Sequence, residues 1–144
     1  MRTSRNLLGH AEIERLLRRL TEVVLEKADA ARGREIARVG YLDNYYPADA
    51  LGINHGWCAL WAVLARRLVG GTIMVTIPHV FLYLRGWSYD AECPEGATSH
   101  MDLPTYQGVP YAAPERATIE CAYDRWDGEV PYERPPFHWL KEIT

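Results

Sequence analysis

Hydrophobic positions between residues 10 and 32 recur every three or four residues along the chain. Seven apolar side chains form this pattern: Ile13, Leu16, Leu17, Leu20, Val23, Val24 and Ala28. That spacing places them on one face of an α-helix, and charged residues occupy the other faces. Gly33 is a candidate C-terminal stop, although residues 34–39 can add another turn. The segment therefore predicts an amphipathic helix that packs its apolar stripe against a core.

A second segment, residues 57–69, is apolar nearly all round until its last turn, with the sequence WCALWAVLARRLV. A helix of this kind is covered on several sides and lies in the centre of a fold. Arg66 and Arg67 suit the negative pole of its dipole, and the glycines that follow favour a stop. This orientation places Cys58 at the positive, N-terminal end of a central helix.

Three short segments after this helix are typical of β-strands. Residues 72–77, 79–84 and 87–91 are rich in β-branched and aromatic side chains. Between the last two, Arg85 and Gly86 predict a tight hairpin turn. The hairpin indicates an antiparallel sheet.

The rest of the chain gives weaker signals. Residues 40–56, with aromatic residues, glycines and a proline, predict a loop. Residues 93–114 predict a long covering loop, residues 116–123 a fourth strand, and the tail an irregular surface segment. We therefore expect an α+β fold in which an N-terminal helix and a central buried helix pack on a small antiparallel sheet. We expect one domain over residues 1–144.

Composition narrows the class of protein. The chain has 144 residues, of which 48% are hydrophobic and 24% charged, as in ordinary globular proteins. A net charge of −3 provides no basic field for nucleic acid. No apolar run approaches the ~20 residues of a membrane span, and the first residues lack a signal-peptide pattern. We expect a cytoplasmic protein that binds neither nucleic acid nor membrane, with its oligomeric state open.

Three cysteines, Cys58, Cys93 and Cys121, cannot all pair within one chain, so no disulfide framework is predicted. Free thiols suit a reducing compartment. The N–H groups at a helix N-terminus lower the pKa of a thiol, and the thiolate is the attacking species. The backbone N–H of Cys58 would also point toward a developing oxyanion. The alternative is that Cys58 packs as a small buried hydrophobe.

A nucleophilic cysteine needs a base, and the base needs an acceptor that orients it. His79 opens the second strand. A two-residue turn makes Asp90 its diagonal neighbour on the same face, ~7–8 Å away at Cα. A three-residue turn would send Asp90 to the other face, which leaves Glu92 as the fallback. Either residue alone fits a structural role, but together with Cys58 they predict a catalytic triad.

The stretches GWCALWA and HVFLYLRGWSYDA resemble the core of papain-like and NlpC/P60-like cysteine hydrolases. The resemblance covers about thirty-five residues, 56–91. It implies that Cys58 is the nucleophile, His79 the base and Asp90 the orienting acid, in the same order as in transglutaminase-like proteins. It also implies an amide or isopeptide bond in a protein or peptide substrate, cleaved through a thioester, with no cofactor and no metal. Deamidase and acyltransferase activities remain open.

Two departures from that pattern matter. Papain relatives carry an upstream glutamine as an oxyanion donor, whereas Gln107, the only glutamine here, lies downstream. Asn44 and Asn54 are the upstream amides, and Asn54 is better placed, although a role as a loop or N-cap residue just before the helix fits it at least as well. The chain also lacks a second lobe, so residues 41–54 and 96–114 would have to form the cleft.

Two other readings compete with catalysis. A zinc site is possible in principle from four residues: His55, Cys58, Cys93 and His100. The chain has no CxxC pair, and these spacings match no common zinc module. A protein-binding module without catalysis would use exposed aromatic residues, for which Trp126 and Trp139 in the tail are the candidates.

Overall fold

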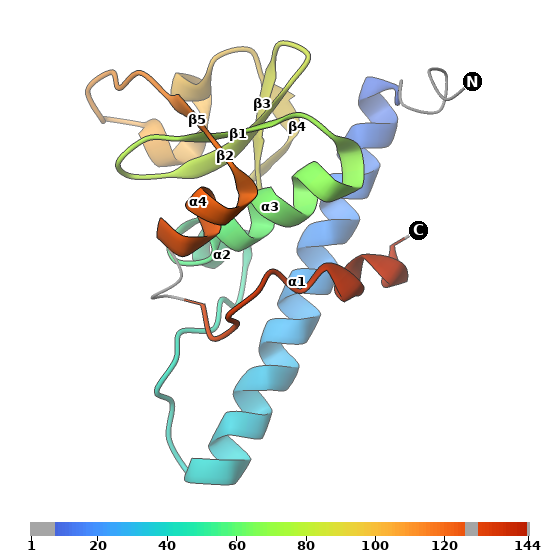
Figure 1. The fold of residues 1–144 in the computed structure, drawn as a ribbon, viewed down its shortest axis with the longest axis vertical. Coiled ribbons are helices and arrows are strands. Elements are labelled where there is room, and N and C mark those ends of the chain that lie inside the picture. Colours follow the sequence, from blue (N-terminus) through green and yellow to red (C-terminus); the bar gives the residue numbers. More distant parts are fainter. Residues whose placement is uncertain (1–7, 126–129, 144) are drawn as a thin grey trace.

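The computed structural model describes residues 8–125 and 130–143. Its longest element is α1 (His10–Val39), whose C-terminal half extends well beyond the sheet (Figure 1). All seven residues of the predicted stripe are buried, which confirms the amphipathic helix. The helix does not stop at Gly33. It ends where Gly40 adopts a left-handed conformation, with φ of 83°, and donates its N–H to the Ile36 carbonyl.

The central helix is α3 (Cys58–Val69), as predicted. Its first eight residues are all buried, and its last turn carries the exposed Arg66 and Arg67. The helix contacts α1 on one side and the sheet on the other. A short helix, α2 (Ala50–Asn54), precedes it inside the segment predicted as a loop. Cys58 is thus the first residue of a helix enclosed by the core.

The sheet has five antiparallel strands in the order β4-β3-β2-β1-β5. Their bounds are β1 (Thr72–Val75), β2 (Val80–Leu84), β3 (Trp87–Asp90), β4 (Cys93–Ala97) and β5 (Glu115–Ala117). The first three match the predicted strands, and the α+β fold is confirmed. Val80 and Leu82 face the main core, so His79 and Phe81 point to the opposite face of the sheet.

The turn between β2 and β3 has two residues. Arg85 and Gly86 both have positive φ, 49° and 88°, as in a type I′ hairpin turn. Leu84 pairs with Trp87, which is the register that the sequence predicted. Asp90 therefore lies on the same face as His79.

The fourth predicted strand, residues 116–123, is wrong beyond Ala117. The chain instead begins α4 (Ile119–Arg125), because the Thr118 hydroxyl accepts the Cys121 N–H and caps the helix. An alternating pattern over so few residues does not distinguish one long strand from a short strand followed by a helix. The short β5 is what remains of the prediction.

The covering loop predicted for residues 93–114 is only partly correct. Its first five residues form β4, in which Gly96 has a φ of 86° and packs closely against the Tyr89 ring. Two 3₁₀ turns follow, His100–Asp102 and Pro104–Tyr106. They cover the outer face of the sheet, where a second hydrophobic cluster contains four buried residues: Phe81, Cys93, Leu103 and Tyr106.

The tail packs against the main core. Its 3₁₀ helix spans Phe137–Glu142, and Trp139 is only 5% exposed. The prediction that Trp139 forms an exposed contact is therefore wrong, and Trp126 lies outside the described residues. Within the described part of the chain, no helix is both long and apolar enough to cross a bilayer.

Candidate active site

A turn at residues 55–57 joins α2 to the first turn of α3. The Trp57 N–H donates to the Ile53 carbonyl at 2.8 Å, the spacing of an α-helix. Asn54 is the last residue of α2, and the three residues 55–57 separate it from Cys58, the first residue of α3. Trp57, which is fully buried, donates its ring N–H to the Tyr45 carbonyl at 3.1 Å. Cys58 is therefore held on a rigid segment, at an end where backbone N–H groups lack helical partners.

His79 and Asp90 form a buried hydrogen-bonded pair. The distance from His79 Nε2 to Asp90 Oδ2 is 2.9 Å, and the residues are 0% and 1% exposed. The predicted contact between the carboxylate and one imidazole nitrogen is confirmed. The second carboxylate oxygen, Oδ1, accepts the Glu92 N–H at 3.0 Å. Because both oxygens are engaged, the carboxylate fixes the orientation of the imidazole ring.

The other imidazole nitrogen, Nδ1, is buried and has no hydrogen-bond partner within the described residues. Because Nε2 is hydrogen-bonded to Asp90, Nδ1 is the nitrogen that can interact with the Cys58 thiol. Burial lowers the pKa of His79, but the Asp90 hydrogen bond and the interaction with Cys58 outweigh burial and raise it to about 9. Asp90 and Cys58 thus favour an imidazolium between them.

Aromatic side chains surround this pair. Phe81 stacks on the His79 ring at a centroid distance of 6.4 Å, and Tyr106 meets the ring edge-on at 5.8 Å. The Tyr106 hydroxyl lies 2.6 Å from the Thr76 hydroxyl, and burial raises the pKa of Tyr106 to about 12. Phe81 could have been found from the sequence, because it lies two residues after His79 on the same strand. Tyr106 gave no such signal.

Cys58 is 4% exposed and is thus buried like His79 and Asp90, so the three predicted residues form an enclosed site. The loop that precedes His79 is open to solvent, with Ile77 and Pro78 exposed at its tip. A substrate that reaches the sulfur has to approach through side chains that now cover it.

The fourth predicted site residue, Asn54, is also buried. Its Nδ2 donates to Glu92 Oε1 at 2.8 Å. The N-cap alternative for Asn54 is wrong, because Trp57 occupies the N-cap position of α3. The other upstream amide, Asn44, donates to Glu35 Oε1 at 2.7 Å, so it serves a different cluster. Glu92 is not the orienting acid for His79, since its carboxylate bonds to Asn54.

The competing zinc site is not assembled. No three His, Cys, Asp or Glu side chains within the described residues lie close enough to hold a metal ion. The His100 ring instead contacts the Ala112 carbonyl through Nε2 at 2.9 Å.

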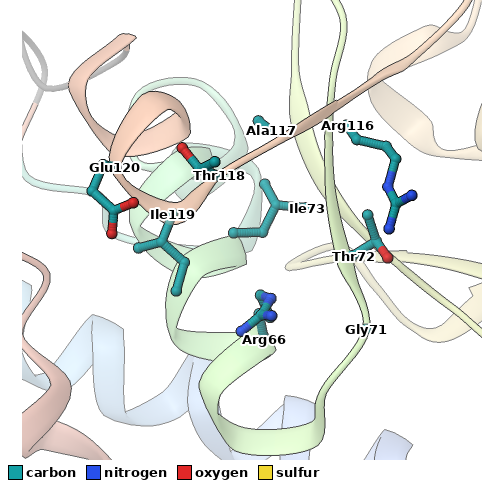
Figure 2. Close-up of a pocket in the computed structure, with 9 residues that line it drawn as sticks. All are labelled: Arg66, Gly71, Thr72, Ile73, Arg116, Ala117, Thr118, Ile119 and Glu120. Atoms are coloured by element: carbon teal, nitrogen blue, oxygen red, sulfur yellow. The ribbon is translucent and has the colours of Figure 1, made fainter.

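A cavity of about 480 Å³ lies at the other end of α3 (Figure 2). Arg66 reaches it from the last turn of the helix, whereas Cys58 is in the first turn. In Figure 2 the side chains of Arg116 and Thr72 lie on one side of the view, and those of Ile119 and Glu120 lie on the other. This cavity is separate from the site around Cys58.

Compared with known proteins, the chain matches no family model, no curated protein and no solved structure. Its function has to be inferred from the chemistry of Cys58, His79, Asp90 and Asn54 themselves.

Proposed function

We propose that this protein is a cysteine-dependent hydrolase that cleaves an amide or isopeptide bond in a protein or peptide substrate. The observation that carries the proposal is the buried His79–Asp90 pair, whose free nitrogen Nδ1 is left for a cysteine at a helix start. The order of Cys58, His79 and Asp90 along the chain resembles that of papain-like and NlpC/P60-like hydrolases, and membership of that superfamily is part of the proposal. Free cysteines suit a reducing, cytoplasmic compartment.

In the first half of the reaction, before the substrate is attacked, the proton of the Cys58 thiol passes to His79 Nδ1, which gives a thiolate–imidazolium pair. The thiolate attacks the substrate carbonyl carbon and forms a carbon–sulfur bond, which leaves a negative charge on the oxygen. The Cys58 N–H and the Asn54 amide supply hydrogen bonds to that oxyanion. Asp90 stabilises the imidazolium meanwhile.

The tetrahedral intermediate then collapses. His79 gives its proton to the leaving nitrogen, the carbon–nitrogen bond breaks, and an acyl thioester stays on Cys58. In the second half, His79 deprotonates a water that attacks the thioester, the carbon–sulfur bond breaks, and release of the acid product restores the thiolate–imidazolium pair. A deamidase releases ammonia in the first half, and an acyltransferase accepts another nucleophile in place of water.

The alternative, in which Cys58 is only a packed hydrophobe, leaves the neighbouring groups unexplained. Burying an imidazole and a carboxylate costs desolvation energy that hydrophobic residues of similar volume avoid. An unpaired buried nitrogen such as His79 Nδ1 adds to this cost. Groups that are costly for stability and complementary in geometry are typical of active sites.

The test uses p-nitrophenyl acetate, an activated ester that acylates reactive thiolates. We expect a burst of p-nitrophenol, followed by mass spectrometry that finds the acetyl group on the peptide containing Cys58. Cys58→Ala should remove the burst, while the matched variant Cys121→Ala, at an exposed site on α4, should keep it. A burst that survives Cys58→Ala would sink the proposal.

A further inference from the structure

Glu92 follows the end of β3 and connects two parts of the site. Its backbone N–H donates to Asp90 Oδ1 at 3.0 Å, and its carboxylate accepts the Asn54 amide at 2.8 Å. Asp90 in turn holds His79. One residue therefore joins the amide that lies four positions before Cys58 to the acid that orients the base.

We propose that Glu92 is a positioning residue, which holds the Asn54 amide in the direction that stabilises the oxyanion. The inference rests on the proposed function, since it concerns the same reaction.

The charge of the carboxylate explains why this residue type suits the task. An ionised carboxylate only accepts hydrogen bonds, so it selects the nitrogen of the Asn54 amide and turns the amide oxygen away. The nitrogen carries two N–H groups, and fixing one of them fixes the direction of the other. A charge-assisted hydrogen bond is also roughly twice as strong as a neutral one.

The different burial of Asn54 and Glu92 distinguishes this role from general packing. Asn54 is 4% exposed, whereas Glu92 is half-buried and lines a cavity of about 510 Å³ together with α1 and α2. Glu92 therefore bonds to the buried Asn54 amide through one carboxylate oxygen and also lines this cavity. A side-chain substitution at Glu92 leaves its backbone bond to Asp90 in place, so it perturbs the Asn54 amide selectively.

Two reagents distinguish positioning from structural damage. Acylation by p-nitrophenyl acetate passes through an oxyanion, while alkylation by iodoacetamide is a direct displacement that forms none. We expect Glu92→Ala to slow acylation of Cys58 about 100-fold, at the lower end of the range of about 10²- to 10³-fold seen when an oxyanion donor is lost. Alkylation of Cys58 should stay within about 2-fold of the unaltered protein, because Asp90 and His79 are untouched.

Three further variants sharpen the test. Glu92→Gln still offers an acceptor oxygen to Asn54 but loses the charge, so its acylation rate should fall between those of the unaltered protein and Glu92→Ala. Asn54→Ala should match Glu92→Ala, and the double variant should be no slower than either, because both remove the same interaction. Glu95→Ala, an exposed glutamate on β4, is the matched control and should change neither rate.

The outcomes are distinct. Selective loss of acylation in Glu92→Ala, with non-additivity and an intermediate rate in Glu92→Gln, supports the inference. Equal loss of both rates in Glu92→Ala, or full acylation in that variant, overturns it. If the unaltered protein is not acylated at Cys58 at all, the proposed function fails, and the inference fails with it.

Discussion

Asp90→Asn is the substitution that probes the triad most selectively. The side chain keeps its shape but loses the charge that faces His79 Nε2 at 2.9 Å. An amide can also donate a hydrogen bond to Nε2, which would move the ring proton to Nδ1. A protonated Nδ1 cannot accept the proton of Cys58, so the variant loses both the charge and the correct tautomer.

The size of the effect follows from the ionisation of His79. Its pKa is raised from 6.5 to about 9 against the opposing effect of burial, with the Asp90 hydrogen bond the largest favourable cause. At 1.36 kcal/mol for each pH unit, the net effect of these interactions and of burial favours the imidazolium by about 3 kcal/mol. Without the carboxylate, less remains to offset the desolvation of the buried imidazole, so the pKa of His79 should fall. In a comparable triad the aspartate-to-asparagine change costs about 10⁴-fold in turnover, and we expect a loss of at least about 10³-fold here.

The assay combines two measurements. Burst rates with p-nitrophenyl acetate give the loss of acylation, and NMR titration of the imidazole proton signals gives the pKa of His79. Asp102→Asn, an exposed residue in the covering segment, is the matched control and should leave both unchanged within about 2-fold. A loss below about 10-fold, or an unchanged titration of His79, would refute the role assigned to Asp90.

Three further predictions concern single residues. Cys58→Ser should abolish acylation while far-ultraviolet circular dichroism and the melting temperature change little, because the swap is nearly isosteric; retained turnover would exclude Cys58 as the nucleophile. Cys58→Ser should also lower the pKa of His79, because one of the causes that raise it is the interaction with Cys58; NMR titration checks this, and a pKa that stays near 9 would contradict it. Glu35 accepts hydrogen bonds from Asn44, Tyr46 and the Asp43 backbone, and the Asn44 bond is the main cause that lowers its pKa to about 2. Its stabilisation is therefore present above about pH 4.5 and is lost as the pH falls toward 2. Glu35→Gln should lower the melting temperature at pH 7 and reduce its decline below pH 4.5; identical curves would contradict this role.

The parts of the site that the sequence could predict depend on local geometry. The two-residue turn at Arg85 and Gly86 fixes the register of β2 and β3, and that register alone places Asp90 on the face of His79. The position of Cys58 follows equally from the apolar segment that begins beside it. These features need no knowledge of distant contacts.

The parts that the sequence could not predict depend on distant contacts. Tyr106 reaches His79 from a 3₁₀ turn 27 positions along the chain, and nothing in its local pattern indicates this contact. The sequence offers Glu92 as the alternative to Asp90, but the Glu92 carboxylate instead accepts a hydrogen bond from Asn54, 38 residues away in the chain. The helix α4 was missed because Thr118 acts as a cap, which outweighs a short alternating pattern. The burial of Trp139 could not be predicted, because the proline-rich tail has no hydrophobic periodicity that would indicate a buried face.

Alkylation by limiting iodoacetamide at pH 6, followed by mass spectrometry of the three cysteine-containing peptides, tests the nucleophile most directly. An ordinary thiol with a pKa near 8.5 is almost entirely protonated at this pH and reacts slowly. Burial raises the pKa of Cys93 to about 12, so this thiol should not react. Cys121 is exposed and serves as the internal reference for accessibility without activation. We predict that Cys58 is alkylated first despite its burial and that Asp90→Asn slows this reaction. Preferential alkylation of Cys121, with Cys58 unmodified, would contradict a thiolate held by His79.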